Sequence, residues 1–263
     1  MKGVRSTIRS RRLRVVREAY LGTLITLCLS VSCQKEQDMS DAHLEQNVQI
    51  EATESSEEQI QEIASALNLQ AYSAEEKVTR LLQEIASQQK AKLQGLEHRL
   101  KTKSSTLRKL KKMHHDAPQI PLKQLKISDA LRYTIEVADT PEGHYVTAVK
   151  TFLEILEAKG NKVIKVKNYW PKGDNYSGVN TILETPEGLE WELQFHTPAS
   201  YQEAKQSHTK YEKLRATETS LTERQKLFNE MATPWEEIAI PKDVLTPHNL
   251  HPSEEIKQWS APK

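Results

Sequence analysis

The chain has 263 residues and is poor in cysteine, glycine and aromatic side chains. Its two cysteines, Cys28 and Cys33, lie close together in or beside one apolar segment, which excludes a disulfide framework and a cysteine-based zinc site. Eight glycines and an aromatic content of 6% argue against a β-sandwich or a propeller. The net charge of +1 implies no polyelectrolyte partner for the chain as a whole. Such a chain holds one sizeable domain with extensions.

The amino terminus has the pattern of an export signal. Basic residues crowd the start of the chain, namely Lys2, Arg5, Arg9, Arg11, Arg12, Arg14 and Arg17. The apolar run that follows, residues 19–31, is shorter than the roughly 20 residues that span a bilayer as a helix. Small residues before Cys33 resemble a bacterial lipobox, with Ser30 in place of the usual leucine. We therefore expect residues 1–32 to be a signal peptide and the protein to be exported.

Two fates of the exported chain fit this leader. Lipidation of Cys33 would anchor the protein in a membrane, whereas plain cleavage would secrete it. A retained anchor and a misassigned start remain alternatives. Residues 33–54 are polar and nearly free of large apolar side chains, so we expect a flexible linker. Residues 55–235 form the predicted domain, and the proline-containing residues 236–263 form a predicted extended tail.

The remaining sequence predicts an α/β fold, with a mixed sheet flanked by helices and a helical extension before it. Ser55 and Glu58 fit a capping box, and Ser73 with Glu76 repeats this signature, which predicts two successive helices. Gly160 is a helix stop signal. Apolar periodicity predicts further helices over 104–113, 142–159, 200–215 and 221–231, and strands over 127–137, 163–169, 179–184 and 189–196.

The strand predicted over residues 189–196 alternates strictly between apolar and polar side chains. Glu190, Glu192, Gln194 and His196 share the polar face. Such a row suits acid–base chemistry, although an ordinary amphipathic strand with a solvated face has the same pattern. The row becomes informative only together with the motifs around it.

Residues 99–112 are strongly basic and contain no acidic side chain. Ser105 lies near the start of the helix predicted in this segment. Because a helix amino terminus presents free N–H groups, flanking cations make it suitable for binding phosphate. A solvated basic helix and a nucleic-acid-binding patch are the alternatives.

Four segments together resemble the catalytic core of RelA/SpoT-type alarmone synthetases. Residues 192–197, Glu-Leu-Gln-Phe-His-Thr, resemble the family's Glu-Ile-Gln-Ile-Arg-Thr signature, and residues 169–180 resemble its acceptor loop. Residues 208–211 match its His-x-x-Tyr, and residues 99–109 match its Arg-x-Lys-x-x-x-Ser-x-x-x-Lys. All four occur in the family's order, and compact toxin-type synthetases are the nearest branch.

The resemblance implies a nucleotidyltransferase-like synthetase fold and a magnesium-dependent pyrophosphokinase. Such an enzyme transfers the β,γ-pyrophosphate of ATP to the 3′-hydroxyl of GDP or GTP. Asp129 and Glu192 would be catalytic and would bind Mg²⁺. The nucleotide-binding residues would be Arg99, Lys101, Ser105 and Lys109 around the ATP phosphates, and Arg132, Lys172, Tyr176, Asn180, Gln194, His196 and His208 elsewhere in the site.

Two departures from the family pattern leave the acceptor open, and a third concerns the predicted metal ligand Asp129. Asp129 and Arg132 are closer together than in the family's usual Asp-x-x-Gly-x-Arg, although the difference preserves the alternation of side chains along a strand. Asn180 stands in place of a histidine and His196 in place of an arginine. The alternatives are pyrophosphorylation of adenosine nucleotides or of the tRNA 3′ end, or a non-catalytic lipoprotein that only binds a partner. An export signal before a synthetase core suggests a toxin or effector.

Overall fold

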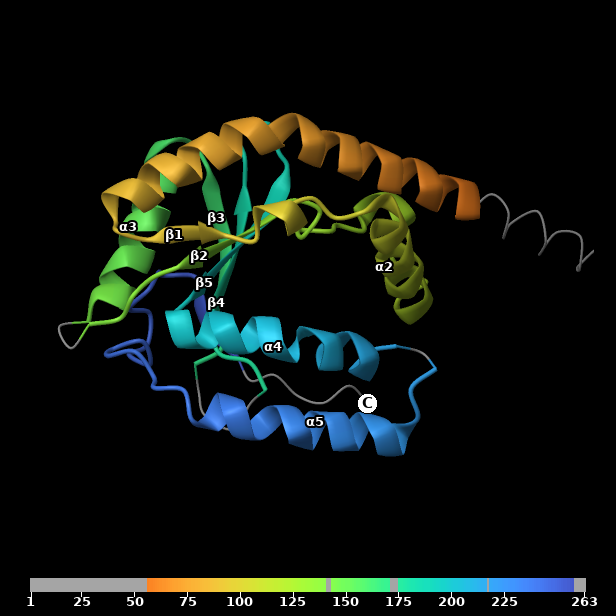
Figure 1. Cartoon of the computed structure of the whole chain (residues 1–263). Coiled ribbons are helices and arrows are strands. Elements are labelled where there is room, and N and C mark those ends of the chain that lie inside the picture. The colour runs from red at the N-terminus through yellow and green to blue at the C-terminus, as the bar shows by residue number, and fades with distance from the viewer. Residues whose placement is uncertain (1–55, 141–142, 171–174, 217, 258–263) are drawn as a thin grey trace, which may run out of the picture. The chain divides into compact units, whose positions relative to one another are not determined.

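The computed structural model (Figure 1) describes residues 56–140, 143–170, 175–216 and 218–257. The chain divides into two compact units, residues 1–59 and 60–263, and the second contains every strand described below. The predicted signal peptide and linker lie outside the described residues. Within the described part of the chain, no helix is both long and apolar enough to cross a membrane.

Six strands form one mixed sheet in the order β1-β2-β5-β4-β3-β6. The β2–β5 and β3–β6 pairs are parallel, whereas the other pairs are antiparallel. This sheet and its flanking helices confirm the predicted α/β fold class. The strands are β1 Lys92–Gln94, β2 Arg132–Glu136, β3 Lys162–Asn168, β4 Val179–Glu184, β5 Glu190–His196 and β6 Glu254–Ile256.

The helices follow the apolar periodicity of the sequence, with one correction. The two helices predicted before residue 90 are one unbroken helix over residues 56–88. Ser73 does not start a helix, because its hydroxyl donates to the Leu69 carbonyl one turn earlier. The other helices are α2 Lys103–Asp116, α3 His144–Ala158, α4 Pro198–Leu214 and α5 Leu221–Glu236, with short 3₁₀ turns at Leu96–His98 and Leu122–Gln124.

One face of the sheet carries the hydrophobic core. Trp191, Leu193 and Phe195 of β5 are buried on this face, as the alternating sequence predicts. The Phe152 ring of α3 packs edge-on against Phe195, with ring centroids 5.5 Å apart. The helix over residues 56–88 joins the same core, and its Thr79 hydroxyl lies 2.7 Å from the Tyr133 hydroxyl. The opposite face, with α4 nearby (Figure 1), is polar and lines the cleft described below.

The segment predicted as an extended tail belongs to the compact unit instead. Val244 and Leu250 are buried in the core, and β6 adds a strand to the sheet. Glu254 fixes the segment, because its carboxylate accepts hydrogen bonds from the Asn168 side-chain amide and the Leu250 backbone N–H. Pro241, Pro247 and Pro252 therefore belong to turns that bring β6 back to the sheet edge.

Candidate active site

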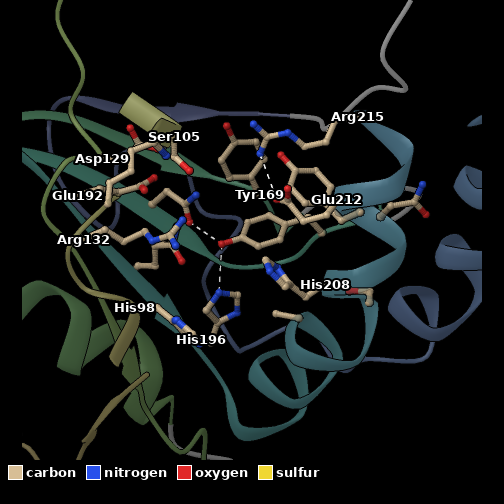
Figure 2. A pocket seen from close by; sticks show the side chains of 18 of the residues that line it. His98, Ser105, Asp129, Arg132, Tyr169, Glu192, His196, His208, Glu212 and Arg215 are labelled. Atoms are coloured by element: carbon tan, nitrogen blue, oxygen red, sulfur yellow. Dashed lines mark hydrogen bonds and ion pairs between the residues drawn. The ribbon is translucent and has the colours of Figure 1, made fainter. Parts of the chain in front are cut away.

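A cleft with a volume of about 690 Å³ lies over the polar face of the sheet. Figure 2 shows Ser105, Asp129 and Glu192 on one side of it, and His208, Glu212 and Arg215 of α4 on the other. The cleft is lined by side chains from the sheet, the start of α2, the inner face of α4 and the end of α5. Side chains far apart in sequence thus face one space.

Glu192 occupies a central position on the floor of this cleft. It is in register with Arg132 of β2 on one side and with Ile182 of β4 on the other. Burial raises the pKa of the Glu192 carboxyl above its usual value, and the charge of Asp129 raises it further. Among the described residues, the Glu192 carboxylate has no hydrogen-bond or ion-pair partner. A half-buried carboxylate without a partner and with a raised pKa is suited to accept a proton.

The pKa of Asp129 is shifted in the opposite direction to that of Glu192. Its carboxylate forms ion pairs with Lys109 Nζ at 2.7 Å and with Lys101 Nζ at 2.9 Å. Burial alone would raise the pKa of Asp129, but the two lysines outweigh burial and lower it to about 2. Asp129 is therefore ionised at neutral pH, and it holds two cations at the edge of the cleft.

The start of α2 supplies a phosphate-binding geometry. Thr102 caps the helix, since its hydroxyl accepts a hydrogen bond from the Ser105 backbone N–H. Ser105 lies in the first turn of α2 and lines the cleft. Lys101 and Arg108 also line the cleft. No acidic side chain lies in the first turn of this helix. The positive end of the helix dipole and the nearby cations therefore face the same space.

Among the described residues, two predicted nucleotide-binding residues, Arg99 and Lys109, are not part of the cleft lining. The Arg99 guanidinium forms an ion pair with Glu75 of the first helix and also donates to the Leu96 carbonyl, so it is directed away from the cleft lining. Lys172 lies outside the described residues. Lys109 is not part of the lining either, but its ion pair with Asp129 holds it close by. Arg132, Gln194 and His208 all line the cleft.

An aromatic and amide cluster forms the far wall. The Tyr176 hydroxyl lies 2.6 Å from Asn180 Oδ1 and 3.1 Å from His196 Nε2. The Tyr176 ring packs edge-on against Tyr169, at 5.5 Å between centroids, and is tilted on Trp235 of α5 at 5.6 Å. His196 is only 1% exposed. Burial lowers the pKa of His196 to about 4, although the Ser177 backbone acts in the opposite sense, so the ring is neutral at pH 7.

The sequence motifs found His208 and Tyr211 of α4 but missed the rest of the contribution of the C-terminal helices. Ala204, His208 and Tyr211 line the cleft from α4 at helical spacing, and Arg215 lines it from the C-terminal cap of this helix. This stripe could have been found from its period of three and four residues. Met231 and Trp235 line it from α5, where nothing in the local sequence distinguishes a cleft residue from a core residue. His98 lies in a 3₁₀ turn, which carries no periodic signal.

The donor set of the cleft fits a hard divalent cation. Among the described residues, no group of three histidine, cysteine or acidic side chains is positioned to hold a metal ion. Magnesium needs fewer protein ligands, because one or two carboxylates with phosphate oxygens and water complete its shell. Asp129 and Glu192 supply two such carboxylates, near enough for the charge of one to shift the pKa of the other. The predicted magnesium ligands are thus chemically compatible with the site.

Comparison with known proteins finds similarity among solved structures. No protein-family model and no curated protein matches the chain. Small alarmone synthetase 2 from Bacillus subtilis is 21% identical, over 63% of this chain and 88% of that one, with a TM-score of 0.44. Small alarmone synthetase 1 from the same organism, bound to its product pppGpp, is 17% identical over 64% and 89%, with a TM-score of 0.43.

A further solved structure is that of the Type VI effector Tas1 with its immunity protein. It is 19% identical over 65% of this chain and 94% of that one, with a TM-score of 0.42. At such identities and scores, the activity of this chain has to be inferred from its own cleft.

Proposed function

We propose that this chain is a magnesium-dependent pyrophosphokinase that transfers the β,γ-pyrophosphate of ATP to the 3′-hydroxyl of a guanine nucleotide. One observation supports this most strongly: Glu192, a carboxylate without a partner and with a raised pKa, lies next to the ionised Asp129 in a cleft that also holds a basic helix start. Phosphoryl-group transfer depends mainly on positioning and on charge neutralisation, and this cleft offers both.

The ATP phosphates would bind at the start of α2. Lys101 and Lys109 already hold one anionic group, the Asp129 carboxylate, at 2.9 and 2.7 Å. Phosphate oxygens can replace that carboxylate as the partner of the lysines, while Ser105 donates from the first helical turn. Asp129, so released, would hold Mg²⁺, which when bound neutralises charge on the phosphates, and Glu192 would either complete the metal shell or serve as the base described next.

Glu192 would act as the general base. It would accept the proton of the attacking 3′-hydroxyl as that oxygen bonds to the β-phosphorus and AMP departs with the electrons of the broken P–O bond. A base works best when its pKa approaches the ambient pH, and burial together with Asp129 moves Glu192 in that direction. Tyr176, Asn180, Gln194 and His208 would form the acceptor side, where Lys172 is also predicted.

A polynucleotide acceptor such as the tRNA 3′ end is the second candidate. Lys103 and Arg108 of α2 are exposed beside the cleft, and Arg108 also lines it. Cations that continue outward from an active site can bind successive phosphates of a long acceptor. Adenosine nucleotides are a third acceptor. A non-catalytic binding role would retain the cleft without turnover.

We also propose that the protein is exported as a lipoprotein or a secreted protein and acts as a toxin or effector in another cell. The basic and apolar leader and Cys33 support this proposal. Export would place a synthetase where nucleotides are scarce. In the cytoplasm of a recipient cell, its nucleotide substrates would be available.

Labelled ATP and Mg²⁺ with separate acceptors test the activity. The purified protein would be incubated with GDP, GTP, ATP alone or deacylated tRNA, and the labelled products separated. We expect a labelled product with GDP or GTP. Transfer to tRNA alone would replace the guanine-nucleotide proposal with the second candidate.

Glu192→Gln is the matched inactive variant. Glutamine keeps the shape of the side chain, so circular dichroism should show an intact fold while transfer falls by about 10²–10⁴-fold, the usual contribution of a general base. Equal rates in the variant and the wild type would remove Glu192 from the mechanism, and transfer by neither would support a binding role.

A further inference from the structure

A chain of hydrogen bonds runs behind the acceptor wall of the cleft. It links Ser200 of α4, His196 of β5, Tyr176 and Asn180 of β4, with distances of 3.0, 3.1 and 2.6 Å between successive polar atoms. Figure 2 shows the two bonds that meet at the tyrosine hydroxyl as dashed lines, one of them to His196. Both nitrogens of the buried His196 ring are therefore engaged within the protein.

The contact between Tyr176 and Asn180 determines which groups donate and which accept along this chain of hydrogen bonds. Asn180 Oδ1 is an amide oxygen, which can only accept a hydrogen bond, and it lies 2.6 Å from the Tyr176 hydroxyl. The Tyr176 hydroxyl therefore donates to Asn180 Oδ1. Its single proton is then used, so the hydroxyl accepts from His196, whose Nε2 must carry a proton.

The other end of the chain agrees with this direction. The His196 ring is neutral, so with Nε2 protonated its Nδ1 accepts from the Ser200 hydroxyl at 3.0 Å. Ser200 Oγ in turn accepts from the Thr197 backbone N–H at 3.0 Å. The Ser200 hydroxyl has a second acceptor within reach, the Thr197 carbonyl at 3.3 Å, so the shorter distance favours donation to His196 Nδ1 and the ring protonation tested below decides between the two.

The amide of Asn180 is thereby fixed in one orientation. Its oxygen is used by Tyr176, while its Nδ2 has no hydrogen-bond partner among the described residues, and Asn180 lines the cleft. Gln194, its partner in register on β5, lies beside it on the same face. Without the chain, the amide could rotate and present its oxygen instead.

We propose that Ser200 and His196 are positioning residues that act through Tyr176 to hold the Asn180 amide with its NH₂ group toward the cleft. The wall then recognises ligand groups that accept hydrogen bonds, such as a carbonyl or phosphate oxygen, and disfavours groups that donate. This proposal rests on the cleft being the acceptor site of the proposed function, and it assigns His196 a role behind the wall rather than in contact with the ligand.

The ring protonation is tested without any substrate. Long-range ¹H–¹⁵N NMR of the ¹⁵N-histidine-labelled protein at pH 7 reports which ring nitrogen carries the proton, and the His196 signals are those missing from the His196→Gln spectrum. We expect a proton on Nε2 and none on Nδ1. A proton on Nδ1 would overturn the proposed direction of the chain.

Two variants of one residue test the effect on the acceptor. In His196→Gln, the longer amide can place an N–H near the position of Nε2 and retain the bond to Tyr176, whereas the shorter His196→Asn side chain cannot reach it. With GDP as the probe, we expect His196→Asn to raise KM by about threefold to tenfold, the value of one hydrogen bond. In His196→Asn the kcat and the KM for ATP should change little, and His196→Gln should restore most of the affinity for GDP that His196→Asn loses.

Thr181→Val is the control for loss of a buried hydrogen bond. Thr181 is fully buried next to Asn180, and its hydroxyl donates to the Leu193 carbonyl away from the cleft. Its KM for GDP should remain that of the wild type. Equal effects of the two His196 variants, or an equal rise in Thr181→Val, would overturn the positioning role. Absence of transfer to GDP by the wild type would refute the proposed function, and NMR would still decide the direction of the chain.

Discussion

At the scale of single residues, the surroundings of two neighbouring carboxyl groups in the cleft shift their pKa values in opposite directions. Two lysines hold the pKa of Asp129 near 2, whereas burial and the Asp129 charge raise the pKa of Glu192. Groups whose environments move their pKa values apart usually have different tasks. On the proposed function, this separation fits cation binding by Asp129 and proton transfer by Glu192.

The raised pKa of Glu192 predicts a pH-dependent rate. Transfer requires the ionised carboxylate, so the rate should fall as the pH is lowered through a pKa above the ordinary value of 4.5. Rates of pyrophosphate transfer measured from pH 4 to 9 should show this acid limb, and residual activity of Glu192→Gln should lack it. A wild-type rate that is flat down to the ordinary value would contradict the assignment.

The same shift predicts that Glu192→Gln stabilises the fold. A glutamate whose pKa is raised by folding destabilises the native state at pH 7, and this penalty disappears as the pH falls and the group is protonated. The uncharged variant should therefore have a higher Tm than the wild type at pH 7, with the difference shrinking at low pH. A lower Tm at pH 7 would show that Arg132 and the lysines outweigh the cost of burial.

Asp129→Asn should separate phosphate binding from catalysis. The change removes the anion that occupies Lys101 and Lys109, so ATP has less to displace and should bind more tightly without Mg²⁺. Transfer with Mg²⁺ should fall by about 10²-fold or more, since a predicted metal ligand is lost. Isothermal titration with and without Mg²⁺ measures the first effect. Weaker metal-free binding would argue against Lys101 and Lys109 as phosphate ligands.

Individual site residues could be predicted from the sequence only where strand alternation or a helix-start signal fixes their position. The alternation of β5 placed Glu192 on the polar face from sequence alone, and the helix start predicted the position of Ser105. Arg99 could not be placed in this way, because its partner Glu75 lies on a helix that only tertiary packing brings near. Trp235 reaches the cleft only through the return of α5 along α4, which no local pattern encodes.

At the scale of elements, long periodic segments were predictable and short strands were not. The bounds of β4 agree with the prediction, and α2, α3, α4 and β5 agree closely. β1 and β6 span three residues each, too few for an alternation to be seen, and they exist because a neighbouring strand offers a free edge. The sequence therefore predicts the centre of the sheet better than its edges.

β6 provides a test of how its segment is held. Glu254→Ala removes the acceptor of the Leu250 N–H and one of two acceptors of the Asn168 amide, at about 1–3 kcal/mol for each buried group left unsatisfied. Glu255→Ala is the matched control, because the side chain of that neighbour is 40% exposed and its ion pairs are solvated. Urea denaturation should show a clear loss of unfolding free energy for Glu254→Ala and little for Glu255→Ala. Equal losses would mean that β6 is not fastened through Glu254.

At the scale of the whole molecule, the leader predicts a covalent lipid. Expressed in bacteria with labelled palmitate, the full chain should incorporate label, and Cys33→Ser should abolish it. Cys28→Ser, within the apolar run before the predicted cleavage point, should retain it. Absence of label from the wild type would leave secretion without an anchor as the explanation of the leader, whereas label that persists in Cys33→Ser would place the lipid on another residue.

The parallel pairing of β2 with β5 has a consequence for when the protein becomes active. Asp129 precedes β2 and Glu192 lies in β5, and the chain between them must first complete α3, β3 and β4. Parallel pairs of this separation close long loops and form slowly. On the proposed function, a chain still leaving the ribosome, or drawn unfolded through a membrane pore, would thus carry Lys101 and Lys109 but no assembled pair of Asp129 and Glu192. The cell that makes the protein would then be spared its activity during synthesis, and catalysis would begin only in the compartment where folding ends.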